Sequence, residues 1–442
     1  MNCLQCTAPN RVCCCARRTI AALKRAVTAI SDSISAHFFN RDLHAVDIRP
    51  YSCAASANLT LPVAAMSAPK RILLLSVSAG AGHMRAAEAL RAQAALTPQN
   101  AHATHLDVMQ FVSSGFRKVY TDFYITLVNK HPALWGYLYQ KTNEAASDSS
   151  LQKLRRGVER LSTRALRKEI DAFQPDAIIC THFLPAEILS RMLRNGRLQC
   201  PVWVQVTDFD LHQLWVQDGM AGYFAANDEV AFRMRSQGIA AETIHVTGIP
   251  IMPAFRAPGT RGDCAAQFGI DPQRTTILLM GGGAGLGSLD TIAERLLALP
   301  GDFQLIVMAG KNQVALEALQ ALAQKFPSRL LAQGFTDQVE HLMVCSDLVV
   351  TKPGGLTTSE CLALGLPMIV NAPIPGQEER NADFLLEQGV ALKAFDAVTL
   401  EYRIRYLLTH PEKLADMRAK ALALGRPDAA RVVLDTVLKL IA

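Results

Sequence analysis

Short apolar runs alternate with helical patterns from about residue 70 to the end of the chain. Runs in which every position is apolar are typical of strands buried on both faces of a parallel sheet. We expect such strands at 71–77, 105–108, 176–180, 202–206, 223–226, 244–246, 275–280, 303–308, 330–333, 348–350 and 368–370. Strands that alternate with helices predict an α/β protein built from doubly wound, Rossmann-like domains.

A stretch rich in proline and glycine at 249–262 interrupts this pattern. It divides the chain into an expected N-terminal domain at 66–250 and a C-terminal domain at 251–427. The last segment, about 428–442, is a candidate helix that packs back on the N-terminal domain. A ligand cleft is the default expectation between two open sheets.

Residues 1–65 fall outside the pattern. They carry six of the eleven cysteines, namely Cys3, Cys6, Cys13, Cys14, Cys15 and Cys53. Cys3 and Cys6 have the spacing of half a zinc site, but no second pair follows. Residues 16–39 are compatible with a basic amphipathic helix for targeting or membrane contact. We favour an upstream extension with no packed role, which is either disordered or precedes a natural start at Met66, because Met66 directly precedes a polar stub and the first strand.

Composition narrows the classes of function. Half of the 442 residues are apolar and the formal net charge is +6, a surplus too small to indicate nucleic-acid binding. No apolar run reaches the roughly 20 residues needed to span a bilayer. The scattered cysteines after Met66 indicate reduced thiols and a cytoplasmic location.

The first motif, Ser-Ala-Gly-Ala-Gly-His at 78–83, lies between the first strand and the first helix. Small residues there let a ligand approach the backbone, and a helix N-terminus attracts negative charge. His83 is then a candidate general base in the cleft. A histidine that caps the helix is the alternative.

The second motif, Leu-Met-Gly-Gly-Gly-Ala-Gly-Leu-Gly at 279–287, also follows a strand. A glycine cluster at this place is typical of a phosphate or diphosphate cradle. A nicotinamide cofactor is disfavoured because the G-x-G-x-x-G spacing fails at Ser288 and no ribose-binding acid ends the next strand. A tight turn without a ligand is the alternative.

The third motif, Thr-Lys-Pro-Gly-Gly-Leu-Thr-Thr-Ser-Glu at 351–360, joins a strand to a helix. Amides and hydroxyls at Gly355, Thr357 and Thr358 would face a diphosphate at the helix start. Glu360 is one turn further and can accept hydrogen bonds from a ribose. A capping-box glutamate is the alternative for Glu360.

The fourth motif is Pro-Ile-Pro-Gly-Gln-Glu-Glu-Arg-Asn at 373–381, which we expect to be a polar loop. Gln377 and Glu378 supply the amide and the carboxylate that sugar hydroxyls require. A solvated loop without a ligand is the alternative.

The fifth motif is Val-Thr-Asp-Phe-Asp-Leu-His-Gln-Leu-Trp at 206–215. Its Asp-x-Asp resembles a metal–nucleotide motif of another glycosyltransferase fold, but so short a pattern is common by chance. Backbone amides and helix dipoles can replace a metal in a two-domain chain of this kind, so we assign no metal.

Together the five motifs resemble the lipid glycosyltransferases that include plant monogalactosyldiacylglycerol synthase and bacterial processive diacylglycerol glucosyltransferase. The resemblance runs from about residue 70 to 389. It implies a GT-B fold, in which two Rossmann-like domains face each other across a cleft. It also implies a UDP-sugar donor, UDP-galactose or UDP-glucose, held by the C-terminal domain. A diacylglycerol acceptor would lie in the N-terminal domain, and the anomeric carbon would be inverted without a cofactor or metal.

The same resemblance assigns roles to matching positions. His83 matches the general base, with Asp208 as the second catalytic candidate. Gly82, His212 and Trp215 match the acceptor side. The donor-binding positions are Gly283, Phe335, Thr336, Gly355, Thr357, Thr358, Glu360, Gln377 and Glu378, of which Phe335 and Thr336 would hold the uracil.

Two segments suggest contact with anionic membrane lipids. The first, 111–139, contains Phe111, Phe116, Tyr120, Phe123, Tyr124, Trp135, Tyr137 and Tyr139. The second contains Lys153, Arg155, Arg156, Arg160, Arg164, Arg167 and Lys168. Aromatic and basic side chains suit a headgroup interface, so we expect a peripheral protein on the inner face of the cell membrane. An ordinary core beside a solvated basic helix is the alternative.

Three other functions fit parts of the pattern. A transferase that adds N-acetylglucosamine to a lipid-linked peptidoglycan precursor is the nearest. A UDP-sugar epimerase of the same fold would need no membrane face. A non-catalytic UDP-sugar or lipid sensor would need no base at His83.

Overall fold

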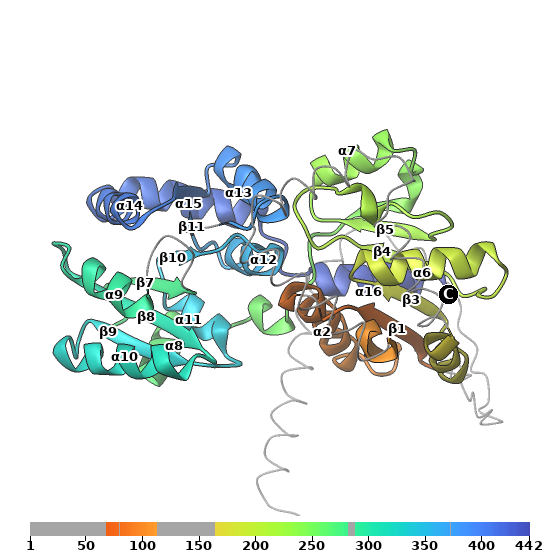
Figure 1. Ribbon diagram of the computed structural model, residues 1–442, viewed down its shortest axis with the longest axis horizontal. Helices are drawn as coiled ribbons and strands as arrows, with labels where there is room; N and C mark the ends of the chain where they lie inside the picture. The colour runs from red at the N-terminus through yellow and green to blue at the C-terminus, as the bar shows by residue number, and fades with distance from the viewer. Residues whose placement is uncertain (1–67, 79, 113–163, 282–287, 372) are drawn as a thin grey trace, which may run out of the picture. The chain divides into compact units, whose positions relative to one another are not determined.

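A computed structural model describes residues 68–78, 80–112, 164–281, 288–371 and 373–442. They belong to one compact unit that extends from Ser67 to Ala442. Its framework is a pair of six-stranded parallel sheets, each covered by helices (Figure 1). Residues 1–65, Gly283 and most of the aromatic and basic segments lie outside the described residues.

The first sheet has the strand order β2-β1-β3-β4-β5-β6. Its strands are β1 (Lys70–Ser76), β2 (Ala101–Asp107), β3 (Ala177–Cys180), β4 (Val202–Gln205), β5 (Gly222–Ala225) and β6 (Ile244–Val246). Its helices are α2 (Ala81–Ala95), α6 (Phe183–Arg194) and α7 (Asp228–Ser236), with short 3₁₀ turns η1 (Val108–Phe111), η2 (Gln213–Trp215) and η3 (Ala241–Thr243). Because all strands are parallel, their carboxyl ends lie along one edge, where the polar motifs follow.

The second sheet has the order β12-β11-β10-β7-β8-β9. Its strands are β7 (Thr275–Met280), β8 (Phe303–Gly310), β9 (Leu330–Gly334), β10 (Leu348–Thr351), β11 (Met368–Asn371) and β12 (Ala391–Ala394). The helices of this half are η4 (Pro253–Arg256), α8 (Arg261–Phe268), α9 (Leu289–Leu297), α10 (Gln313–Lys325), α11 (Val339–Val344), α12 (Gly355–Ala363), α13 (Gln377–Glu387), α14 (Ala397–Thr409) and α15 (Pro411–Leu424).

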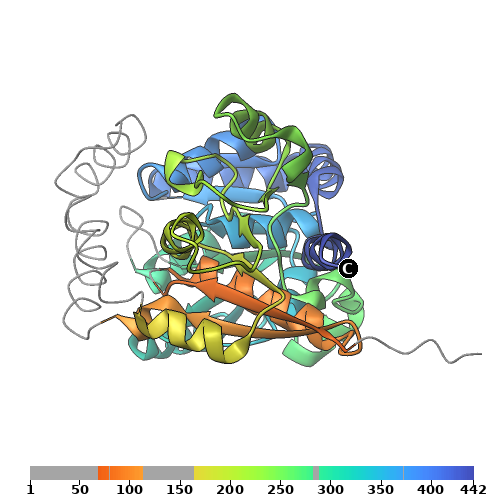
Figure 2. The same cartoon turned by 90° about the vertical axis from the view of Figure 1, so that its right-hand side faces the viewer.

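The last helix, α16 (Ala429–Leu440), packs on the first sheet although it follows the second in sequence. Its buried residues Val433 and Val437 share a hydrophobic cluster with Ile72 and Leu74 of β1. The Lys70 Nζ atom donates a hydrogen bond of 3.0 Å to the carbonyl oxygen of Ile441. The two ends of the described chain are therefore joined on one side of the N-terminal sheet (Figure 2).

The predicted α/β class and doubly wound sheets are confirmed, and the eleven predicted strands are all present. One strand was missed: β12 has the short sequence Ala-Leu-Lys-Ala, which contains no uninterrupted apolar run. The prediction that every strand is buried on both faces was wrong for the edge strands, since most positions of β2 and all of β6 are only partly buried. An edge strand is covered on fewer sides, so it tolerates polar residues.

Candidate active site

His83 lies in the first turn of α2, which begins at Ala81, inside the motif at 78–83 that we expected to precede the helix. The residue before the helix, Gly80, has φ 123° and ψ 137°, a backbone conformation open to glycine but strained for other residues. No side chain caps this helix, so the alternative of a capping histidine is wrong. The main-chain N–H of Ser78 donates to the Asp107 carboxylate at 3.2 Å, which fixes the segment before Gly80.

The imidazole of His83 is oriented by the ends of two neighbouring strands. Its Nδ1 atom lies 3.1 Å from the carbonyl oxygen of Thr181 and 2.8 Å from the Thr207 hydroxyl. Because a carbonyl oxygen only accepts, Nδ1 carries the hydrogen and Nε2 keeps its lone pair. Burial of the ring lowers the pKa of His83 to about 4, partly offset by the Thr181 carbonyl. The ring is neutral at pH 7 with Nε2 available as a base.

A second histidine, His182, was missed by the sequence analysis. Its ring lies edge-on to that of His83, with centroids 4.5 Å apart. Its Nδ1 atom accepts the main-chain N–H of Leu184 at 3.0 Å, which caps α6. Burial, and then the proximity of His83, lower the pKa of His182 well below its usual value. The available signal was the Thr-His pair directly after the fully apolar strand β3, a strand-end position like those of the recognised motifs.

Asp208 is brought into the same group by the loop after β4. It is buried, and its carboxylate accepts hydrogen bonds from the side chains of Trp215 and Asn381. Burial raises the pKa of Asp208 to about 7, and the nearby carboxylates of Asp210 and, to a smaller extent, Glu378 act in the same direction. The second acid of the Asp-x-Asp pattern, Asp210, instead pairs with Arg233 at 3.2 Å.

Two of the three predicted acceptor residues, His212 and Trp215, are buried and stabilise the site from below its surface. The Nδ1 atom of His212 accepts from the Leu214 main chain and caps η2, and His212 itself is buried. Trp215 is only 2% exposed, and its ring centroid lies 6.1 Å from that of His83. The third residue, Gly82, lies beside α12, because a Cβ atom there would be 3.6 Å from Leu356.

The first turn of α12 provides main-chain donors next to the His83 group. Gly354 caps the helix without a side chain, so the first N–H groups have no partner within the helix. Gly355 packs directly on the Thr207 carbonyl, and any Cβ atom there would overlap that oxygen. Thr358 is fully buried and its hydroxyl has no partner among the described residues, while Thr357 is partly exposed. These features fit an anion-binding helix start.

Glu360 lies in the second turn of α12. The alternative of a capping box is wrong, because the third helical position is Thr357. The Glu360 side chain is buried, and burial raises its pKa to about 7. The positive charge of Arg85 lowers that pKa and the negative charge of Glu340 raises it, both by less than burial does.

The segment 373–381 is not a loop throughout, as predicted, but contains the start of α13 at Gln377. The Glu379 carboxylate accepts from the Gly376 main chain at 3.0 Å, the half of a capping box that a glycine N-cap allows, which explains why the helix begins there. Glu378 is buried, and its Oε2 atom accepts from the Ile374 main chain at 2.7 Å. Gln377 is partly buried at the start of the helix.

The predicted uracil residues follow β9. Phe335 is 66% exposed, and the Lys311 ammonium lies 5.0 Å from its ring centroid. The Thr336 hydroxyl accepts from the Gln338 main chain at 3.0 Å, so it stabilises the turn that presents Phe335. Gly283 lies outside the described residues.

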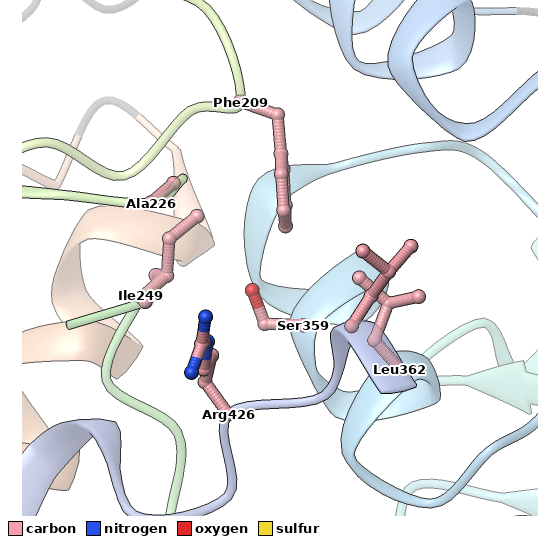
Figure 3. Close-up of a pocket in the computed structure, with 8 residues that line it drawn as sticks. Phe209, Ala226, Ile249, Ser359, Leu362 and Arg426 are labelled. Carbon is pink, nitrogen blue, oxygen red and sulfur yellow. The ribbon is translucent and has the colours of Figure 1, made fainter. Parts of the chain in front are cut away.

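A small cavity lies elsewhere, beside the segments that connect the two sheets. It is lined by Phe209, Ala226, Gly248, Ile249, Ser359, Leu362, Leu424 and Arg426 (Figure 3). Except for Ser359 and Arg426 its side chains are apolar, and it contains none of the predicted site residues. No group of three potential metal-ligand side chains occurs within the described parts of the chain. Over the same residues, no helix is long and apolar enough to cross a membrane.

Solved structures share this architecture at low sequence identity. MurG of Acinetobacter baumannii aligns with a TM-score of 0.54 and 18% identity, over 84% of this chain and all of that one. The UDP-GlcNAc 2-epimerase of Neisseria meningitidis, solved with UDP-GlcNAc, gives 0.54 and 16% over the same shares. These likenesses show the fold, which is GT-B.

Sequence comparison identifies the family. Residues 83–251 match monogalactosyldiacylglycerol (MGDG) synthase, and residues 276–433 match the glycosyltransferase family 28 C-terminal domain. A processive diacylglycerol beta-glucosyltransferase of Bacillus pumilus is 28% identical over 85% of this chain and 96% of its own length. One of Bacillus cereus (strain ATCC 10987) is 30% identical over 62% of this chain and 70% of its own.

The fold and these matches define a UDP-sugar-dependent glycosyltransferase. The chain belongs to the family of monogalactosyldiacylglycerol synthases and processive diacylglycerol beta-glucosyltransferases, as its motifs predicted.

Proposed function

We propose that this enzyme transfers a hexose from a UDP-sugar to the free hydroxyl of diacylglycerol and forms a β-glycosyl diacylglycerol. The observation that carries the proposal is the placement of His83 next to α12. Gly82, the neighbour of His83 in α2, lies close to Leu356 of α12. Thr207 contacts both sides: its hydroxyl lies 2.8 Å from His83, and its main-chain carbonyl packs on Gly355. A base is therefore adjacent to an anion-binding helix start, as transfer from a nucleotide sugar requires.

In the proposed reaction, Nε2 of His83 removes the proton of the acceptor hydroxyl, and the oxygen attacks C1 of the donor. The carbonyl of Thr181 stabilises the imidazolium that forms, because it accepts from Nδ1. Of the two groups Asp208, whose pKa is raised to about 7, has a higher proton affinity than His83, whose pKa is lowered to about 4. The donor's negative diphosphate would raise the pKa of His83, and Asp208 is the second proton acceptor of the group.

The leaving UDP is stabilised by main-chain amides at the start of α12. Thr357 and Thr358 add hydroxyl groups there, and the glycine-rich segment after β7 is expected to complete the cradle. Glu360 accepts hydrogen bonds from the ribose, Phe335 and Thr336 hold the uracil, and Gln377 and Glu378 contact the hexose. A single displacement on the α-linked donor inverts C1 and produces a β-glycoside.

We propose that no metal or other cofactor takes part. The two acids of the Asp-x-Asp pattern have separate protein partners, Asp208 with Trp215 and Asn381, and Asp210 with Arg233. Helix dipoles and amides can supply the charge stabilisation that a divalent cation provides elsewhere.

We further propose that the enzyme works on the surface of an anionic membrane, peripheral to the cytoplasmic leaflet. The described end of the basic segment supports this. Arg164, Arg167 and Lys168 are exposed, whereas Leu166 and Ile170 are buried in the core of the N-terminal half. Glu169 and Asp171 are exposed on the same segment, and Asp171 pairs with Arg167 at 3.4 Å, so the described residues carry a surplus of one positive charge, which favours anionic headgroups.

The test is to incubate the purified full-length chain with diacylglycerol vesicles and either UDP-glucose or UDP-galactose, and to analyse the lipids by mass spectrometry and anomeric NMR. We expect a β-linked monohexosyl diacylglycerol, formed equally well with EDTA. The names of the relatives favour glucose over galactose. An α-linked product would refute single displacement, and loss of activity with EDTA would refute the metal-free account. Conversion of the UDP-sugar to an epimer, or sugar transfer only to a lipid-linked peptidoglycan precursor, would refute the acceptor proposed here.

A further inference from the structure

Asn381 lies one turn into α13, four residues after Gln377, and is fully buried. Its Oδ1 atom accepts the main-chain N–H of Phe209 at 2.9 Å. Its amide nitrogen donates to the Pro353 carbonyl at 3.0 Å and also to the Asp208 carboxylate. The amide oxygen and the amide nitrogen are thus both used within the protein, so this side chain is a fixed structural element.

These partners come from both halves of the enzyme. Asp208 and Phe209 belong to the loop after β4 in the first sheet, whereas Pro353 belongs to the turn before α12 in the second. The Phe209 ring also stacks on Phe384, one turn after Asn381, with centroids 4.9 Å apart. The stretch of α13 from Asn381 to Phe384 therefore contacts both the loop after β4 that carries Asp208, called the catalytic loop below, and the turn before α12 that contains Pro353, called the donor-side turn.

We propose that Asn381 is the positioning residue of the transfer reaction: through Phe209 it orients the loop that carries Asp208, and through Pro353 it connects this loop to the donor-side turn before α12. The expected effect of Asn381 on the reaction rate rests on the proposed function. Its expected effect on the ionisation of Asp208 does not. Because Asn381 is fully buried and its amide oxygen and nitrogen are both hydrogen-bonded, it acts through Asp208 and not by contact with substrate.

The charges around Asp208 show why an N–H donor is needed there. Asp210 and Glu378 are both negative and disfavour the carboxylate, as burial does. Among the residues that the structure describes, only the Trp215 and Asn381 side chains act in the opposite direction, by donating hydrogen bonds. Removal of the Asn381 amide leaves Trp215 alone to stabilise the charged form. The fraction of ionised Asp208 at neutral pH then falls.

Asn227 offers a matched control. It is also an asparagine bonded to Phe209, with its Nδ2 atom 3.4 Å from the Phe209 carbonyl, and its Oδ1 atom caps α7 through the Val230 main chain. It belongs to the first half and is not among the groups that act on Asp208. Asn227→Ala therefore removes a comparable loop contact without touching the carboxylate.

The first measurement needs no turnover. Ionisation of Asp208 is followed by the fluorescence of its partner Trp215 during a pH titration of the full chain. Trp215→Phe and Asp208→Asn identify the signal, and melting curves confirm that each variant is folded. We expect a wild-type midpoint near pH 7. The midpoint should rise by roughly one pH unit or more in Asn381→Leu, the effect of losing one hydrogen bond to a charged group. The midpoint should also lie above the wild-type value in Asn381→Asp, which adds a third carboxylate, and it should stay unchanged in Asn227→Ala.

The second measurement is kinetic. In both Asn381 variants kcat at pH 7 should fall roughly five- to a hundred-fold, the smaller figure being the loss of ionised Asp208 that a rise of one pH unit causes, and UDP affinity should stay within about twofold of wild type. An unmoved midpoint in folded Asn381→Leu and Asn381→Asp, or an equal shift in Asn227→Ala, would overturn the inference. A wild-type enzyme that forms no glycolipid, yet shows the predicted midpoints, would refute the proposed function and leave the Asn381–Asp208 link established.

Discussion

The carbonyl oxygen of Thr181 lies 3.1 Å from the Nδ1 atom of His83, and this contact determines which ring nitrogen is the base. An imidazole that donates from Nδ1 has its lone pair on Nε2. The Thr181 hydroxyl also donates to the His83 main-chain carbonyl at 2.9 Å, so one residue fixes the histidine at two points. The end of β3 therefore sets the geometry of a base that belongs to another strand–helix unit.

His83→Ala should lower kcat by roughly 10² to 10⁴, the usual contribution of general-base catalysis. UDP binding should persist, because the proposed donor contacts lie in the second half. Kinetics with saturating UDP-sugar and calorimetric titration of UDP separate the two effects. A variant that no longer binds UDP would indicate a diphosphate contact, and near-normal kcat would transfer the base role to Asp208.

The pH dependence of the wild-type enzyme should report two groups. In free enzyme His83 gains its proton only near pH 4, so its neutral form is complete above pH 6. Asp208 gains its proton near pH 7. A base role for His83 predicts an acidic limb of kcat/KM close to pH 4, which His83→Ala abolishes. A limb near pH 7 that disappears in Asp208→Asn would show that the reaction needs the Asp208 carboxylate, and the absence of a limb near pH 4 would then identify the aspartate as the base.

Glu360→Gln should raise the donor KM roughly ten- to a hundred-fold through loss of a charge-assisted hydrogen bond of about 1.5–3 kcal/mol. Acceptor KM should change little. Because burial raises the pKa of Glu360 to about 7, wild-type donor affinity should weaken as the pH falls below 7, and the variant should lose this dependence. An unchanged donor KM would exclude Glu360 from the site.

The same pKa has a consequence for stability. Glu360 has a higher pKa in the folded chain than its usual 4.5, so the folded state binds more protons between about pH 4.5 and 7. Its contribution to the free energy of unfolding is therefore present at low pH and declines as the pH rises through 7. Urea unfolding at several pH values should show a smaller decline in Glu360→Gln.

Gly355→Ala should disrupt the contact between the two halves at the site. The added Cβ atom would overlap the Thr207 carbonyl, and α12 would have to move away from the loop that contacts His83. We expect kcat to fall at least tenfold with a melting temperature only moderately lower. Gly262→Ala is the control, since Gly262 lies in α8 and a Cβ atom there meets only the Thr260 hydroxyl, at 3.9 Å. Equal activities in the two variants would contradict the close packing.

A chain that starts at Met66 should retain full transfer activity. The first strand begins at Lys70, and every described site residue follows it. Activity of the shortened chain on diacylglycerol vesicles, compared with the full chain at equal concentration, is the measurement. Loss of activity with an unchanged melting temperature would assign a role to residues 1–65.

The sheets were predictable because buried parallel strands leave uninterrupted apolar runs, and the motifs were recognisable because they follow those runs. Helix starts were less accessible: the hydrogen bond from the Gly376 main chain to the Glu379 carboxylate stabilises the start of α13 at Gln377, where the polar sequence resembled a loop. His182 and Asn381 were missed for a different reason. Their roles depend on partners far apart in sequence, Asn381 being 172 residues from Phe209. The position of His182 at a strand end was a local signal, but the approach of its ring to that of His83 cannot be read from the sequence.

The return of α16 to the first sheet affects how the chain folds during synthesis. The apolar cluster that contains Ile72 and Leu74 is completed by Val433 and Val437, which lie close to the C-terminal end of the chain. At about 5–20 residues per second, the ribosome needs on the order of 10–40 s to proceed from β6 to α16. During this interval the N-terminal half has an uncovered apolar face. A chaperone that binds nascent chains should therefore associate with this protein until termination, and a stop codon before residue 429 should yield an aggregating product even though every proposed catalytic residue is present.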